Sequence, residues 1–230
     1  MIRLSPRICR LASVGAGLVT LYGCATHRAE VPSTTAAPHI TVRPGRMGLV
    51  VAAAPATSDV DSGAMAAEIA RRTGFGLVVT VPGRWIAEST ETARVVAETY
   101  ERSVREAAQG PLRFYAEIHG NARQQCAGQL EIATVGVDRE LALRLRALVE
   151  LIRDAYLRAN HEVQRLDVLV EPVDAVTDRV SGAGRDGILR LPERALQIEL
   201  PRCARRDWHD TYTSILADFL AQAVILSAGR

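Results

Sequence analysis

The sequence predicts a single-domain α/β fold in which a mostly parallel, mixed sheet is covered by helices on both faces. From residue 47 onward, apolar runs of strand length alternate with amphipathic segments of helix length. Parallel strands are joined by crossovers that lay helices on the faces of the sheet, so this alternation is typical of such folds. The 230 residues suffice for one domain with a sizeable core.

Six segments are expected to be strands, because they are short, apolar or alternating in polarity, and bounded by Gly, Pro or polar residues. They cover residues 47–53, 76–82, 112–119, 129–135, 167–170 and 194–200. Residues 176–191 contain the stretch S-G-A-G-R-D-G and are expected to be mostly loop. That stretch lacks the Lys-Ser/Thr of a phosphate-binding loop.

Four segments show the spacing of amphipathic helices. They cover residues 62–73, 88–109, a long segment that begins at a capping Asp138, and 207–227. The long third helix is expected to bury a stripe that consists of Leu141, Leu145, Leu148, Ile152 and Tyr156.

The charge pattern gives no reason to expect nucleic acid as a partner. The formal net charge is +2, and the basic residues are spread along the chain. A nucleic-acid interface would instead gather them into a patch or stripe.

The N-terminus resembles a bacterial lipoprotein signal. Three arginines precede a short apolar run at 11–20, and L-Y-G-C follows at 21–24. The run is too short to span a bilayer and is typical of an export signal. Cys24 is then the lipidated residue, although Tyr22 is bulkier than the residue usual at its place. An ordinary signal peptide or an uncleaved anchor is the alternative.

This interpretation divides the chain into a signal peptide (1–23), a flexible tether (24–45) and an α/β domain (46–230). Ala25 stands where an inner-membrane retention signal would have Asp. We therefore expect the protein on the periplasmic face of the outer membrane, attached through its N-terminal lipid.

Polar residues follow or close several expected strands, and the carboxyl ends of parallel strands are where α/β sheets bind ligands. Glu117 and His119 end one strand, and Glu199 lies near the end of the last strand. Asp59 and Asp61 follow the first strand. One imidazole and several carboxylates are what a hydrolytic zinc site needs. The plainer alternative is a solvated Glu117 and a half-buried structural His119.

Three motifs resemble the N-formylglutamate amidohydrolase group, which belongs with zinc carboxypeptidase-like and polyglutamate hydrolases. They are E-I-H-G-N at 117–121, Q-L-E-I-A-T-V-G at 129–136 and A-L-Q-I-E-L-P at 195–201. The resemblance implies that His119 is a metal ligand, that Asp61 or Asp59 is another, and that Glu199 is the general base. Glu117 would support the ligands from behind.

The chain departs from the family where a Pro-His-Gly-Gly loop would supply the first histidine ligand. It has Pro55-Ala56-Thr57-Ser58 there, so Ala56 replaces that ligand. Members of the family also have a segment rich in Asn and Arg before the second helix, and in this chain that segment is reduced to residues 82–85. Arg84 in this remnant, and Arg202 with its neighbours Arg205 and Arg206, are candidates for binding a substrate carboxylate. A solvated loop is the alternative for the arginine cluster.

The sequence therefore predicts an envelope lipoprotein with an amidohydrolase-like domain and an incomplete zinc site. It would bind a small carboxylate or peptide-like ligand. The alternative is an active zinc-dependent enzyme that cleaves an amide next to a carboxylate.

Two cysteines remain after the signal and the lipidated residue are set aside. Cys126 and Cys203 follow the strands of His119 and Glu199 by short loops, so we expect them to form a disulfide beside the site. Spacing alone is equally compatible with two free thiols.

Overall fold

The computed structural model describes residues 39–53, 60–80, 90–121, 128–177 and 187–228. All of them belong to one compact unit, which covers residues 37–230. Seven strands form one mixed sheet in the order β1-β3-β2-β4-β7-β5-β6. The strands are β1 (Ile40–Arg43), β2 (Arg46–Ala53), β3 (Phe75–Thr80), β4 (Phe114–Gly120), β5 (Gln129–Val135), β6 (Asp167–Val170) and β7 (Arg194–Leu200).

The sheet is mostly parallel, as the sequence predicts. β3, β2, β4 and β7 run parallel, and β5 and β6 run parallel to each other. The antiparallel pairs are β1 with β3 and β5 with β7. The carboxyl ends of four adjacent strands therefore meet at one edge of the sheet, where the candidate site lies.

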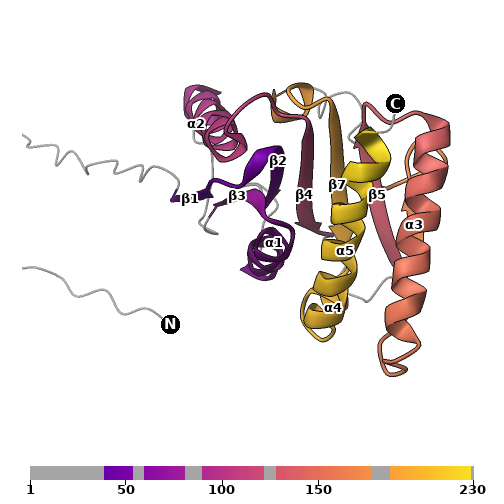
Figure 1. Ribbon diagram of the computed structural model, residues 1–230. Coiled ribbons are helices and arrows are strands. Elements are labelled where there is room, and N and C mark those ends of the chain that lie inside the picture. The colour runs from indigo at the N-terminus through magenta and orange to yellow at the C-terminus, as the bar shows by residue number, and fades with distance from the viewer. Residues whose placement is uncertain (1–38, 54–59, 81–89, 122–127, 178–186, 229–230) are drawn as a thin grey trace, which may run out of the picture. The chain divides into compact units, whose positions relative to one another are not determined.

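Helices cover both faces (Figure 1). They are α1 (Val60–Thr73), α2 (Thr90–Ala108), α3 (Arg139–Leu157), α4 (Arg202–Arg205) and α5 (His209–Ala228), with a 3-10 turn at Gly187–Arg190. α1, α3 and α5 pack in the larger core with alternate strand residues such as Val51 and Ile118. α2 packs in the smaller core with the intervening residues, including Val50 and Tyr115. The period-2 alternation of each strand separates the two cores.

The segment 40–43, assigned to the tether by the sequence, forms the edge strand β1. Ile40 pairs with Thr80 and Arg43 with Leu77. Its half-buried, alternating I-T-V-R pattern is four residues long, which makes it a weak signal in the sequence. The sheet thus includes residues that precede the expected start of the α/β domain at residue 46.

The buried side of α3 is rotated relative to the expected stripe. Leu141, Leu145, Val149 and Arg153 are buried, whereas Leu148 and Ile152 are only partly covered. Asp138 caps the helix as predicted, because its side chain accepts a hydrogen bond from the Leu141 backbone N–H.

α5 is the one helix among the described residues that is long and apolar enough to cross a membrane. Half of its apolar window is buried in the fold, however, as in the core helix of a globular domain. Its contacts with α1 and α3 account for this composition.

Candidate functional site

His119 and Glu199 lie side by side at the carboxyl edge of the sheet, where the sequence places both residues. β4 and β7 are adjacent and parallel, and their register pairs His119 with Glu199 and Glu117 with Gln197. Paired residues on neighbouring strands project from the same face, so all four side chains share one face. They lie on the side that α2 covers, beyond the apolar packing of Val50 and Tyr115.

A buried imidazole lies between two buried carboxylates. His119 Nε2 is 3.4 Å from Glu117 Oε2, and His119 Nδ1 is 3.5 Å from Glu199 Oε1. The exposed fractions of His119, Glu117 and Glu199 are only 5%, 4% and 6%. These distances are longer than those of well-formed hydrogen bonds, so the three side chains are in close polar contact without hydrogen bonds of normal length between them. Glu117 is thus neither a solvated strand end nor remote from the imidazole.

Two further polar side chains extend the row across the sheet. Gln197 Nε2 donates to Glu199 Oε1 at 3.0 Å. On the next strand, β5, Glu131 is the register partner of Glu199. Its carboxylate accepts from the Thr177 backbone N–H at 2.5 Å and from Thr177 Oγ1 at 3.0 Å. Both carboxylate oxygens of Glu131 therefore accept hydrogen bonds from Thr177.

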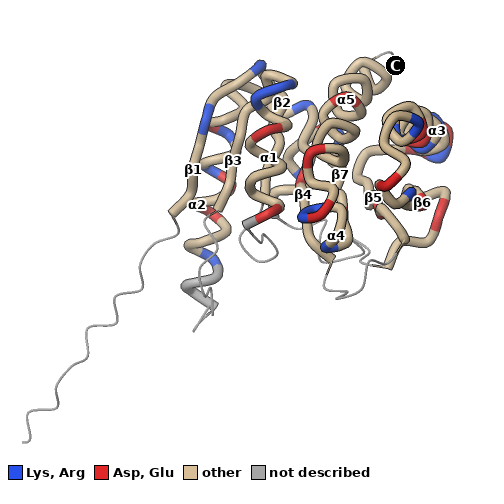
Figure 2. The backbone as a smooth tube through the Cα atoms, turned by 90° about the horizontal axis from the view of Figure 1, so that it is seen from below, with Lys and Arg blue, Asp and Glu red and all other residues tan. Residues whose placement is uncertain are grey.

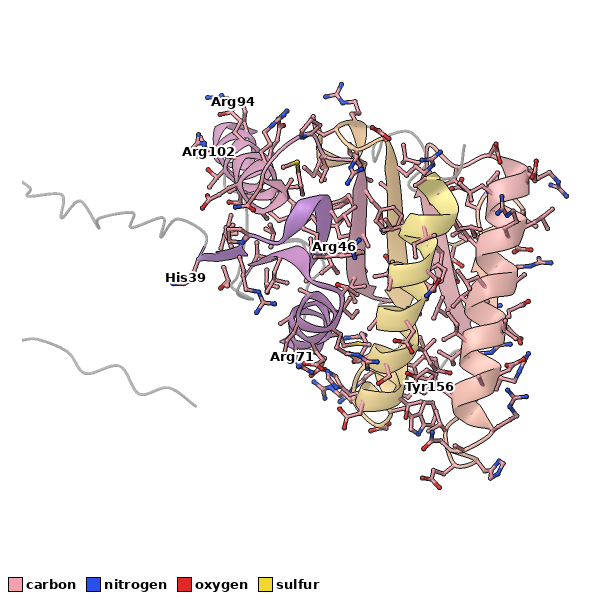
Figure 3. The ribbon with its side chains drawn as sticks, in the orientation of Figure 1. His39, Arg46, Arg71, Arg94, Arg102 and Tyr156 are labelled. Atoms are coloured by element: carbon pink, nitrogen blue, oxygen red, sulfur yellow. The ribbon has the colours of Figure 1, made fainter. Side chains whose placement is uncertain are left out.

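Two buried tyrosines lie next to Glu117, on the inner side of the candidate site. The hydroxyl groups of Tyr100, on α2, and Tyr115, on β4, are 2.8 Å apart. Burial, and then the nearby charge of Glu117, raise the pKa of both phenols well above the ordinary value. Both hydroxyls therefore keep their protons and can act as donors toward the carboxylate. Arg94 and Arg102 lie on the outer side of the same helix (Figure 3).

Asp61, the predicted carboxylate ligand, is held by an arginine. It lies in the first turn of α1, and its Oδ2 accepts a hydrogen bond from Arg206 Nε at 2.6 Å. The ion pair joins α1 to the segment just after α4. Asp59, Ala56 and Arg84 lie outside the described residues, as do Cys24 and Cys126.

The described residues do not complete a zinc site. Bonds of about 2.0–2.1 Å put two ligands of a tetrahedral zinc ion roughly 3.3 Å apart. The 3.4 Å between His119 Nε2 and Glu117 Oε2 matches that spacing. In the part of the chain that the structure describes, however, no three His, Cys, Asp or Glu residues are placed to hold a metal ion. A catalytic zinc ion normally has three protein ligands.

The arginines after β7 differ in their placement. Arg202, a predicted substrate-binding residue, is exposed, and Arg205 is buried. Arg205 Nε donates to the Leu200 carbonyl oxygen at 3.2 Å, and its guanidinium lies against Gly120. Burial lowers the pKa of Arg205.

Cys203 is buried and takes part in a disulfide. The other half of this disulfide lies outside the described residues. The pairing with Cys126 stays a prediction.

Tyr100, Tyr115, Gln197 and Glu131 were not predicted as part of the site. For Tyr115 the signal is present in the sequence, because residues 115, 117 and 119 alternate onto one face of β4. The other three depend on which strands and helices become neighbours, which the order of elements leaves open.

No protein-family model and no curated protein matches the chain. Among solved structures, the zinc-free form of YndL is similar at 13% identity, over 79% of this chain and 89% of that one, with a TM-score of 0.46. A bacteriophage poly-gamma-glutamate hydrolase is similar at 13% identity, over 81% and 88%, with a TM-score of 0.44. The N-acetylmuramoyl-L-alanine amidase AmiC2 of Nostoc punctiforme is similar at 16% identity, over 79% and 99%, with a TM-score of 0.36. Similarity at this level carries no inference about activity.

Proposed function

We propose that this protein is an exported lipoprotein with an amidohydrolase-like domain whose zinc site is altered. The domain would bind a small carboxylate or peptide-like ligand without hydrolysing it. The observation that carries the proposal is the arrangement around His119. Its two ring nitrogens face Glu117 and Glu199. Among the described residues, neither these three side chains nor any other three His, Cys, Asp or Glu residues are placed to hold a metal ion.

The engagement of Asp61 supports the same conclusion. A carboxylate that accepts a 2.6 Å hydrogen bond from Arg206 has its charge balanced by the guanidinium. Zinc would have to compete with this ion pair. Together with Ala56 in place of the family's first histidine, this favours a domain that has lost its metal.

The ligand is expected at the carboxyl edge of β4 and β7, because open α/β sheets bind ligands there. Arg202 begins α4, one residue after β7, and is exposed, so its guanidinium is accessible to a carboxylate. Anchoring through lipidated Cys24 would hold the domain at the periplasmic face of the outer membrane.

An active zinc amidohydrolase is the second candidate. It is favoured by the register that places His119 beside Glu199, the residues that the family resemblance assigns to metal binding and to general base catalysis. In that case the missing ligand must come from outside the described residues, for instance from Asp59.

Metal analysis separates the two candidates. Residues 25–230, which contain the whole compact unit, would be dialysed against limiting zinc and analysed for metal, with His119→Ala and His161→Ala as variants. We expect no stoichiometric zinc in any of the three proteins. Stoichiometric zinc that is lost in His119→Ala and kept in His161→Ala would overturn the proposal in favour of an enzyme. His161 is exposed on the turn after α3 and serves as the matched control.

Ligand binding and lipidation need separate tests. N-formylglutamate should raise the melting temperature of the wild type and remain intact, and Arg202→Ala should reduce this shift. Metabolic labelling with palmitate should mark the full chain and not Cys24→Ala. Release of formate would contradict binding without hydrolysis. Labelling that survives Cys24→Ala would contradict lipidation at Cys24.

A further inference from the structure

α3 presents a continuous stripe of side chains on its outer side. The members follow the alternating three- and four-residue spacing of a coiled-coil seam. They are Glu140, Arg144, Ala147, Leu151, Asp154 and Arg158. All are exposed except Asp154, which is half-buried, and Leu151 is 68% exposed. Leu151 lies next to the exposed Ala147 and Ile225 around one groove. Exposed apolar side chains that are contiguous, with charged residues around them, mark contact surfaces.

The inner side of α3 is fixed to the rest of the domain. Leu145 and Val149 are buried in the larger core. Tyr156 Oη donates to Asp218 Oδ2 of α5 at 2.6 Å, and Figure 3 shows Tyr156 between the two helices. α3 lies at one edge of the molecule, beside β5 and β6 (Figure 2). The stripe is therefore held in place on an accessible side.

A groove runs beside the stripe between α3 and α5. It has a volume of about 560 Å³ and is lined by Ala147, Leu148, Leu151, Ile225 and Leu226, with Arg144 and Gln222. Ile225 is 65% exposed. A large side chain from another helix could enter this space.

The stripe is complementary to itself when two copies of α3 are placed antiparallel. With the twofold axis at residue 149, Glu140 faces Arg158 of the second copy, and Arg144 faces Asp154 of the second copy. In the middle, Ala147 faces Leu151 of the second copy, so a small side chain meets a large one. Each pairing occurs twice, because a twofold interface is symmetric.

We propose that a second copy of this chain docks on this stripe, and that the protein is an antiparallel α3–α3 dimer. The parallel alternative would place Glu140 against Glu140 and Arg144 against Arg144, which like-charge repulsion disfavours. In the antiparallel dimer Leu151 of each copy packs on Ala147 and borders the groove of the other. Asp154 keeps its contacts with Arg153 and Arg165 and joins Arg144 through its exposed half.

Sedimentation analysis of residues 25–230 over a range of concentrations tests the dimer. We expect the wild type to sediment as a dimer and Leu151→Asp as a monomer at the same concentrations. Val95→Asp is the matched control, because Val95 is also an exposed apolar residue on a helix surface. A monomeric wild type, or a dimer that Leu151→Asp leaves intact, would overturn the proposal.

Charge reversal tests the register. Glu140→Arg and Arg158→Glu should each raise the dissociation constant on the order of tenfold or more, because each change turns two attractions into repulsions. The double variant restores opposite charges and should recover dimerisation. Each reversal opposes the helix dipole, so the double variant has the least stable helix, and its recovery cannot come from better folding. Failure of the double variant to recover would exclude this register.

Discussion

His119 Nδ1 lies 3.5 Å from Oε1 of Glu199, its register partner on the neighbouring parallel strand. The contact follows from the sheet itself, since paired residues of β4 and β7 project side by side. With Glu117 near the other ring nitrogen, the imidazole lies between two buried carboxyl groups inside the fold. Buried polar groups lower the stability of a fold unless they interact favourably with one another, so the energies of these three side chains should be coupled.

A double-mutant cycle measures this mutual support. His119→Gln and Glu199→Gln should each lower the free energy of unfolding by about 1–3 kcal/mol, because each leaves a buried polar group without its counterpart. The double variant should lose less than the sum, with a coupling of about 0.5–3 kcal/mol. Urea denaturation of the four proteins gives the values. Additivity within about 0.5 kcal/mol would show that the two side chains are neighbours without energetic coupling.

The tyrosine pair predicts a loss of stability in alkali. Burial and the charge of Glu117 raise the pKa values of Tyr100 and Tyr115, so the native state keeps both protons while the unfolded chain loses them above about pH 10. The unfolded state then binds fewer protons, and the free energy of unfolding falls as the pH rises. The slope above pH 10 should become shallower in Tyr115→Phe. Tyr212, with its pKa raised to about 12, should maintain part of the slope in the variant.

Tyr115→Phe also removes the bond to the Tyr100 hydroxyl and should cost about 1 kcal/mol near neutral pH. Urea denaturation at pH 7 and at a series of pH values above 10 separates this constant cost from the pH-dependent part. An unchanged slope would mean that the Tyr115 phenol ionises as freely in the native state as in the unfolded chain.

The sequence predicts the central features of the site because they depend on local pattern. His119 and Glu199 each lie near the end of an expected strand, and the expected sheet is mostly parallel. These two features suffice to place both residues at one edge of the sheet. β5, β6 and β7 have the predicted bounds. Strong apolar runs between turn residues define such strands without reference to their neighbours.

What the sequence misses depends on tertiary neighbours. The burial of Arg205 requires knowing that α4 turns back over Gly120. The engagement of Asp61 requires knowing that Arg206 comes next to α1, residues far apart in the chain. Arg153 breaks the expected apolar stripe of α3 because a backbone carbonyl group inside the fold needs a donor, a need that periodicity does not reveal.

Arg153 is accordingly expected to be a determinant of stability. It is 1% exposed, and its Nη1 donates to the Leu166 carbonyl oxygen at 2.6 Å. Arg153→Met preserves much of the side-chain volume but removes this donor, and should lower the free energy of unfolding by about 1–3 kcal/mol. Arg102→Met on the exposed side of α2 is the control, with an expected change within about 0.5 kcal/mol. Equal effects in the two variants, measured by thermal unfolding, would contradict a specific role for the buried guanidinium.

Gly120 should tolerate no side chain, because Arg205 occupies the space beside it. A Cβ atom on Gly120 would lie 2.4 Å from Cζ of Arg205, well inside contact distance. The guanidinium is buried and bonded to the Leu200 carbonyl oxygen, so it cannot move aside freely. Gly120→Ala should therefore lower the free energy of unfolding by about 1–3 kcal/mol. Gly128→Ala is the control, since its Cβ would meet nothing closer than 3.7 Å.

Removing the arginine should remove the conflict. In an Arg205→Ala background, adding Gly120→Ala should cost far less than it does in the wild type, because the space beside residue 120 is then open. Thermal or urea unfolding of the four proteins measures this difference. If Gly120→Ala cost the same in both backgrounds, the intolerance would arise from the backbone of β4 itself. The tight contact between Gly120 and Arg205 would then not be the reason why a glycine follows His119.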